Sequence, residues 1–367
     1  MADVRAQRLA HLLVHYCTEV KPGQWVGILG DVCTLDMLRL VHQEVVHAGG
    51  HPHLMMSDER MNRDFLREAS DDQFAWLNPA LQAYYDDADV YIRIGGAPNT
   101  RAMTGIPASR VQALRKAQRS FLDTRLHRAA RGEFRWVGTW FPTEASAQEA
   151  NMSLEEYEDF VYSATFCDKA DPVAEWLKIR AMQQEKIDWL AGRKNIALNG
   201  PNIDLKLSID GRTFINSDGT RNMPSGEIFT SPVEESVNGW VRFSYPSIVG
   251  GRAVSGIELT FKDGKVVEAS AEQNEDLLYA QLDTDDGSRY LGEFAIGTNF
   301  GINRFTGNIL FDEKIGGTVH MAIGQGYPET GSKNSSAVHW DMICDMRNDS
   351  EIHIDDELFY RNGQFQV

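Results

Sequence analysis

Two different patterns of apolar residues divide the chain near residue 190. Up to about residue 125, the short apolar runs "QWVGILGD" (24–31), "HPHLMMS" (51–57) and "ADVYIRIGG" (88–96) alternate with segments of helical periodicity. Strand–helix–strand units of this length form a parallel sheet with helices on both faces. We therefore predict an α/β N-terminal domain with a parallel doubly wound sheet, in which "RSFLDT" (119–124) is the fourth strand.

The pattern then becomes helical and finally strand-rich. "MSLEEYEDFVYSA" opens with Ser153 and Glu156 in capping-box spacing, and "DPVAEWLKIRAMQQEKIDWLAG" is a long helix stopped by Gly192. From residue 195 onward, short apolar runs are separated by Asp-Gly and Gly-rich turns, of which "FKDGKVV" is the clearest hairpin. A chain of 367 residues is also long for one core. We predict two domains: 1–190, α/β with a helical connector, and 191–367, a β-rich α+β C-terminal domain.

The charge balance and the cysteines limit the partners and the compartment. Lys and Arg number 36 against 53 Asp and Glu, a net charge of −17. This disfavours nucleic acid and anionic membrane surfaces and favours cationic ligands such as metal ions, amines or a free peptide N-terminus. The four cysteines form no C-x-x-C pair, which is typical of a reducing compartment. No run approaches 18 apolar residues. We predict a cytoplasmic protein with no membrane partner.

The first half contains no strong chemical motif. "GILGDVCT" follows a strand but lacks G-x-G-x-x-G, so an ordinary strand–helix turn is preferred over a dinucleotide loop. Seven of the ten histidines precede residue 130, none in an H-E-x-x-H pattern. His51 and His53 lie two apart on a predicted strand, but no nearby carboxylate completes a metal site.

The stronger candidates lie in the second half. In "SAVHWDMICD" (336–345), His339 and Asp341 are two apart, so a strand would point both to one face. Glu227, Glu293 and His320 likewise stand beside or within apolar strands. A carboxylate in such a strand costs several kcal/mol unless it is paired. Mutual hydrogen bonds, arginine partners and one or two shared divalent ions would all meet this need.

Several longer segments extend this picture. "FPTEASAQEANMSLEEYEDF", "NMPSGEIFTSP" and "GEFAIGTNFGINRFTGNILFDEKIGGTVHMAIGQGYPETGSKNSSAVHWDMICDMR" resemble the thermophilic-type metallo-aminopeptidases, the family of aminopeptidase T and aminopeptidase S. The resemblance implies a dimeric, two-domain cytosolic exopeptidase that uses two divalent metals on peptides with a free N-terminus. It places the metal ligands at five positions: Glu227, Glu293, His320, His339 and Asp341.

The resemblance also implies a mechanism. Two ions, for which Zn, Co, Mn and Mg remain open, share a water whose pKa falls towards 7, and we expect Glu293 to bridge them. Tyr327 follows the flexible segment Gly324–Gly326 and is expected to donate a hydrogen bond to the oxyanion, although a packed aromatic is the alternative. Apart from the resemblance, Glu313 in "FDEKIGG" is a further candidate: it would support a histidine or transfer a proton, or it only pairs with Lys314 or another base.

Two competing hypotheses remain at this stage. The same fold resembles a dihydroxypyridine ring-cleaving dioxygenase with a single Fe(II), for which His339, Asp341 and His320 would suffice. The presence of both Glu227 and Glu293 favours two metals and hydrolysis instead. The second alternative is a non-catalytic binding relative of the family.

Overall fold

The computed structural model describes residues 3–367, which form two compact units. The first unit extends to Val173 and also contains Gly219–Pro224. The second unit contains Ala174–Asp218 and Ser225–Val367.

Helix α10 (Pro172–Leu190) explains why this division differs from the predicted boundary at residue 190. Nearly all of α10 belongs to the second unit, because its side chains bond to that unit. Lys186 Nζ donates to the carbonyl of Val367 at 2.6 Å, and Thr298 Oγ1 donates to Oε1 of Gln183 at 2.6 Å. The predicted connector is therefore part of the β-rich unit.

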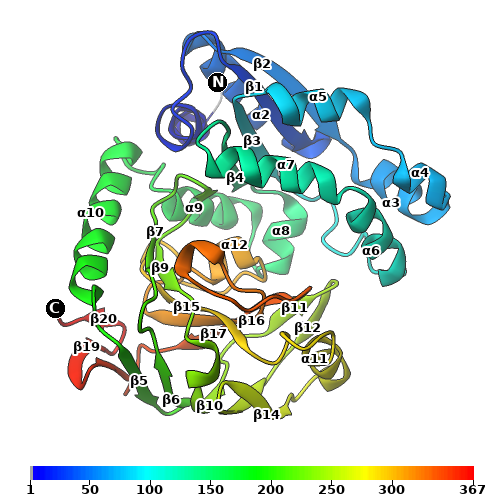
Figure 1. The fold of residues 1–367 in the computed structure, drawn as a ribbon. Helices are drawn as coiled ribbons and strands as arrows, with labels where there is room; N and C mark the ends of the chain where they lie inside the picture. The colour runs from blue at the N-terminus through cyan, green and yellow to red at the C-terminus, as the bar shows by residue number, and fades with distance from the viewer. Residues whose placement is uncertain (1–2) are drawn as a thin grey trace. The chain divides into compact units, whose positions relative to one another are not determined.

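The first unit is built on a five-stranded sheet in the order β2-β1-β3-β4-β8, in which every neighbouring pair is parallel. The alternation of strand and helix in the sequence produces this arrangement (Figure 1) and confirms the predicted α/β class. Its strands are β1 (Trp25–Asp31), β2 (His51–Ser57), β3 (Val90–Gly95), β4 (Arg135–Trp140) and β8 (Asn222–Met223).

Nine α-helices accompany this sheet in the described part of the first unit. The Ser153 side chain accepts from the backbone N–H of Glu156 at 3.2 Å at the start of α9, as the capping box predicted. The helices are α1 (Val4–His11), α2 (Leu35–His47), α3 (Glu59–Glu68), α4 (Asp71–Ala75), α5 (Pro79–Asp87), α6 (Ala108–Ala117), α7 (Arg119–Ala130), α8 (Glu144–Glu149) and α9 (Leu154–Ala164), with a π-helix η1 (Leu12–Cys17) and a 3₁₀ turn η2 (Val32–Thr34).

The predicted strand at 119–124 is wrong, since these residues begin helix α7. Phe121 is buried, whereas Leu122 and Leu126 are exposed. Burial of one side of a helix through Phe121 explains the apolar residue there, which the sequence had suggested was part of a strand. The fourth strand is β4, whose residues "RWVGTW" alternate between buried and half-buried.

The second unit contains three antiparallel sheets. An eight-stranded sheet runs β14-β13-β10-β6-β5-β18-β19-β20, a five-stranded sheet runs β17-β16-β15-β9-β7, and β11 pairs with β12. The strands are β5 (Asn195–Gly200), β6 (Ile203–Ser208), β7 (Ile215–Ser217), β9 (Glu227–Thr230), β10 (Asn238–Arg242), β11 (Ser247–Val249), β12 (Arg252–Val254), β13 (Glu258–Lys262), β14 (Lys265–Ser270), β15 (Leu291–Gly297), β16 (Thr318–Gly324), β17 (His339–Asp345), β18 (Glu351–Ile354), β19 (Glu357–Arg361) and β20 (Gln364–Phe365).

Four short helical segments complete this unit: α11 (Glu275–Leu282), α12 (Ile309–Asp312), η3 (Glu234–Ser236) and η4 (Pro328–Thr330). The predicted "FKDGKVV" hairpin joins β13 to β14, with positive φ at Asp263 and Gly264. This unit confirms the β-rich prediction.

The core of the second unit contains residues of both large sheets. Leu198 and Leu205 from the eight-stranded sheet belong to the same buried cluster as Phe294 and Met321 from the five-stranded sheet. Every residue of β15 and β16 is buried, so both faces of these strands are covered. Any polar side chain on them needs a partner inside the protein.

Candidate metal centre

Strand register brings the five predicted metal ligands onto one face of the five-stranded sheet. Glu293 on β15 pairs with Ala322, and Ala322 pairs with Asp341 on β17, so all three share a face. His320 lies two residues from Ala322 and His339 two residues from Asp341, which places both imidazoles on this face as well.

Glu227 joins the same face from the fourth strand. It is the first residue of β9 and pairs with Gly297, four residues after Glu293 on β15. The preceding Gly226 has φ +108°, and a Cβ there would lie 2.7 Å from the Cβ of Asn299. Glycine is therefore needed at this position, which explains why the Pro-Ser-Gly turn comes before the glutamate.

The donor atoms form two sets that share Glu293. In one set, His320 Nε2 lies 3.4 Å from Oε2 of Glu227 and 3.5 Å from Oε1 of Glu293. In the other, His339 Nε2 lies 3.3 Å from Oε2 of Glu293 and 3.7 Å from Oδ2 of Asp341. The two oxygens of Glu293 thus face different histidines.

These separations fit ligands of a shared ion better than direct ion pairs. Charge-assisted N–H···O⁻ bonds are about 2.7–2.9 Å long, whereas two ligands at about 2.1 Å from a tetrahedral ion are about 3.4 Å apart. Buried polar atoms are also left over, since Oε2 of Glu227 and Oδ1 of Asp341 accept no hydrogen bond within residues 3–367. The donor set therefore fits divalent cations.

A backbone carbonyl fixes the orientation of His339. Nδ1 of His339 lies 2.8 Å from the carbonyl oxygen of Gln325, so this nitrogen carries the hydrogen and donates it. In the neutral ring, Nε2 then presents a lone pair towards Glu293 and Asp341. A metal-binding histidine usually donates one ring N–H to a supporting partner, here the carbonyl of Gln325, and coordinates the metal with the other nitrogen.

The clustered charges shift one another's pKa. Burial raises the pKa of Asp341. Burial would lower the pKa of His339, but Glu293 and Asp341 raise it to about 9. Burial also opposes ionisation of Glu293, yet the two imidazoles hold the pKa of its carboxyl below the usual range. The lowered pKa of Glu293 and the raised pKa of His339 both show that the site attracts positive charge.

Tyr327 lies at the edge of this cluster. Its Oη is 3.3 Å from Nε2 of His339, and its ring meets Phe229 at a centroid distance of 5.2 Å. Burial, together with the charges of Glu293 and Asp341, raises the pKa of Tyr327. The phenol thus keeps its proton and remains a hydrogen-bond donor.

Glu313 and Lys314 follow α12 and approach the cluster from another side. The ammonium of Lys314 has no exposed surface, contacts Glu313, and lies 3.8 Å from Oε1 of Glu227. A carboxylate oxygen of Glu313 is also within 4.8 Å of ligand atoms of His320 and Asp341. Glu313 therefore contacts a lysine and also lies near the candidate metal ligands. The complete burial of Lys314 has no signal in the sequence.

The other predicted candidates do not join this site. His51 and His53 lie on β2 of the first unit and belong to no group of metal-ligating atoms among residues 3–367. A group that the sequence reasoning missed consists of His11, His15 and Glu44, also in the first unit.

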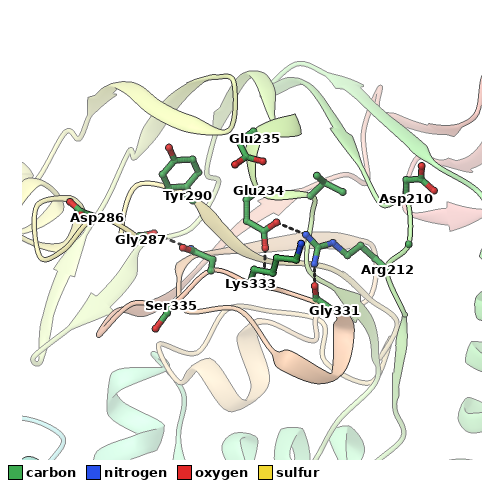
Figure 2. A pocket seen from close by; sticks show the side chains of 13 residues that line it. Asp210, Arg212, Glu234, Glu235, Asp286, Gly287, Tyr290, Gly331, Lys333 and Ser335 are labelled. Atoms are coloured by element: carbon green, nitrogen blue, oxygen red, sulfur yellow. Dashed lines mark hydrogen bonds and ion pairs between the residues drawn. The ribbon is translucent and has the colours of Figure 1, made fainter.

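A separate cavity of about 630 Å³ lies in the second unit and includes the segment after Tyr327 in its wall. Figure 2 shows Arg212 reaching both Glu234 and the carbonyl of Gly331. The backbone N–H of Lys333 donates to Oε1 of Glu234 at 2.7 Å. The segment that carries Tyr327 is therefore anchored by a charged pair.

Buried oxygen and nitrogen donors converging on one sheet face are typical of a divalent-metal protein. Comparison with known proteins gives the family: the chain matches the thermophilic metalloprotease (M29) model over residues 2–365 and belongs to this family. This confirms the predicted resemblance and, with it, a metal-dependent peptidase.

Named relatives of similar length agree with this assignment. The chain is 28% identical to "Aminopeptidase T" of Thermus thermophilus over 347 residues, covering 88% of this chain and 85% of the relative. It is 27% identical to "Aminopeptidase 2" of Geobacillus stearothermophilus over 377 residues, covering 95% of this chain and 90% of the relative. The solved structure "Wild-type AmpT from Thermus thermophilus" superposes with a TM-score of 0.86 at 24% identity, covering 99% of both chains. This superposition confirms the fold.

The helices of residues 3–367 include none with the length and apolarity that crossing a membrane requires.

Proposed function

We propose that this chain is an aminopeptidase that removes N-terminal residues from peptides with the help of two divalent ions. The observation that carries the proposal is the division of the donors into two sets, Glu227 with His320 and His339 with Asp341, which share Glu293. One oxygen of Glu293 faces each histidine, at 3.5 and 3.3 Å. This supports Glu293 as the bridging carboxylate.

The ions would supply a water of lowered pKa and polarise the scissile carbonyl. Side chains of the protein would stabilise the transition state and transfer the proton. Tyr327 keeps its proton and would donate a hydrogen bond to the oxygen that gains charge in the transition state. Glu313, which contacts Lys314, would carry the proton from the attacking water to the departing amine.

A free amine is the proposed recognition element of the substrate. The chain carries a net charge of −17, and four carboxylates lie in or beside the site, so a positively charged α-amine is attracted. An aminopeptidase of this kind should hydrolyse a free-amine peptide and leave its N-acetylated form intact.

Three further proposals accompany this function. The metal is Zn, Co, Mn or Mg, since oxygen and imidazole donors accept all four. A homodimer is proposed from the family resemblance. A reducing cytoplasm is proposed from the cysteines, because Cys33, Cys167 and Cys344 are free thiols.

The function is tested with chromogenic aminoacyl-p-nitroanilides, supplied with each of the four metals in turn. Hydrolysis restored by at least one metal supports the proposal. A chain that binds one iron and consumes oxygen would instead be the ring-cleaving dioxygenase. A chain that turns over no substrate with any metal would be the binding relative.

A further inference from the structure

A second cluster of metal-binding side chains lies in the first unit, where α1 and η1 meet α2. His11 Nδ1 is 3.3 Å and His15 Nε2 is 3.2 Å from the same oxygen, Oε2 of Glu44. His47 Nδ1 is 3.6 Å from the other oxygen of Glu44. Three imidazoles thus surround one carboxylate.

Packing of the two helices, rather than attraction among these side chains, sets this arrangement. Leu9 on α1 and Val41 on α2 are fully buried and fix the helices against each other. His11 and His15 are four residues apart and therefore emerge on one face, with ring centroids 4.3 Å apart. The donor atoms of these two histidines and Glu44 all lie within 4.8 Å of one another.

The distances match the ligand shell of a small transition-metal ion. Ligands at about 2.0–2.1 Å from a tetrahedral centre are about 3.4 Å apart, close to both nitrogen–oxygen distances to Oε2 of Glu44. Among residues 3–367, the ion-pair partners of Glu44 are these three imidazoles alone, so neither lysine nor arginine competes for its charge. Imidazole-rich donors select Zn²⁺, Ni²⁺ or Cu²⁺ over Mg²⁺ and Ca²⁺, which prefer oxygen.

We propose that His11, His15 and Glu44 bind one divalent transition ion at a site separate from the sheet centre. Because His11 lies on α1, His15 on η1 and Glu44 on α2, the ion would link the first helical segments to α2. Because the ion would bind only the folded protein, adding it should raise the melting temperature of the protein.

The test uses the full chain without a purification tag, stripped of metal by a chelator. Ni²⁺ is titrated by isothermal calorimetry into the wild type and into His11→Ala/His15→Ala, and the ions retained are counted by elemental analysis. His42→Ala removes an exposed histidine of α2 that lies outside the cluster and serves as the matched control. Circular dichroism confirms that each variant folds.

The proposal predicts one Ni²⁺ fewer per chain in the double variant and no change in His42→Ala. Glu44→Gln, which keeps the shape but removes the charge, should weaken this binding event by at least about tenfold. Hydrolysis by the metal-loaded double variant should equal that of the wild type, which separates this site from the proposed active site. Equal Ni²⁺ counts in the double variant and the wild type would overturn the proposal.

Discussion

Oη of Tyr327 lies 3.3 Å from Nε2 of His339, and the two rings meet edge-on with centroids 5.1 Å apart. The phenol is thus held beside the nitrogen that faces Glu293 and Asp341. Its raised pKa keeps it a donor throughout the neutral range. This contact joins the metal donors to the group proposed to meet the reacting carbonyl.

Tyr327→Phe tests that role. Loss of a donor that acts only in the transition state should lower kcat by about 10²–10³-fold and leave KM nearly unchanged. Steady-state kinetics on an aminoacyl-p-nitroanilide measure both constants. An unchanged kcat would show that Tyr327 only packs against Phe229.

Lys314→Met removes the buried ammonium but keeps a side chain of similar length. Glu227 and Glu313 then lose a positive partner in a dry environment, so the free energy of unfolding of the metal-free protein should fall by about 3–5 kcal/mol. Urea unfolding measures this change, with the exposed Lys206 on β6 providing the control Lys206→Met. Equal stability of the two variants would mean that Lys314 does not compensate these carboxylates.

Gly226→Ala tests how the turn before β9 presents Glu227. At position 226, the alanine methyl group would clash with Asn299, and the positive φ would add backbone strain. Gly211 also has a positive φ, +72°, but no atom lies within 4 Å of a Cβ placed there. Gly211→Ala should therefore cost only the backbone strain of about 1–2 kcal/mol. Gly226→Ala should cost more, and it should also weaken metal binding by displacing Glu227. Normal metal affinity in Gly226→Ala would contradict this explanation.

The Arg212–Glu234 pair predicts a dependence of stability on pH. Burial opposes ionisation of Glu234, but hydrogen bonds from the Lys333 backbone and from Arg212 hold its pKa below the ordinary value. A carboxyl with a lowered folded pKa stabilises the protein above the unfolded pKa of about 4.3 and loses this contribution as pH falls through the folded pKa. Glu234→Gln should therefore destabilise by about 2 kcal/mol at pH 7.

The same difference should begin to shrink as the pH falls below the unfolded pKa of about 4.3, and should disappear once the pH is below the lowered pKa of the folded carboxyl. Urea unfolding of both proteins at pH 7 and at pH 3.5–4 makes the comparison. A difference that stays constant over this range would show that the charge of Glu234 does not stabilise the anchor.

The sequence predicts which side chains of a single strand share a face, because that depends only on residue spacing along the strand. The spacing of His339 and Asp341 was enough to place both on one face of a strand, and the apolar neighbours of Glu293 indicated a buried carboxylate. Which donors would face each other depends on strand order and register, which no local pattern contains. The burial of Lys314 and the bond from His339 to Gln325 depend in the same way on the assembled sheet.

Errors in the fold prediction have a similar origin. Residues 119–124 contain apolar side chains that suit either a short strand or one face of a helix, and only packing around Phe121 decides between them. Helix α10 was correctly expected to end before Gly192, but its attachment through Gln183 and Lys186 to distant residues could not be read from its own sequence.

Two donor sets that share Glu293 are proposed to hold two divalent ions. The most direct measurement is the number of ions per chain in tag-free His11→Ala/His15→Ala, in which the proposed helix site is disabled, after saturation with Zn²⁺ or Co²⁺ and removal of excess metal. Elemental analysis should find two ions per chain. A single ion per chain in this fully folded variant would contradict the proposal.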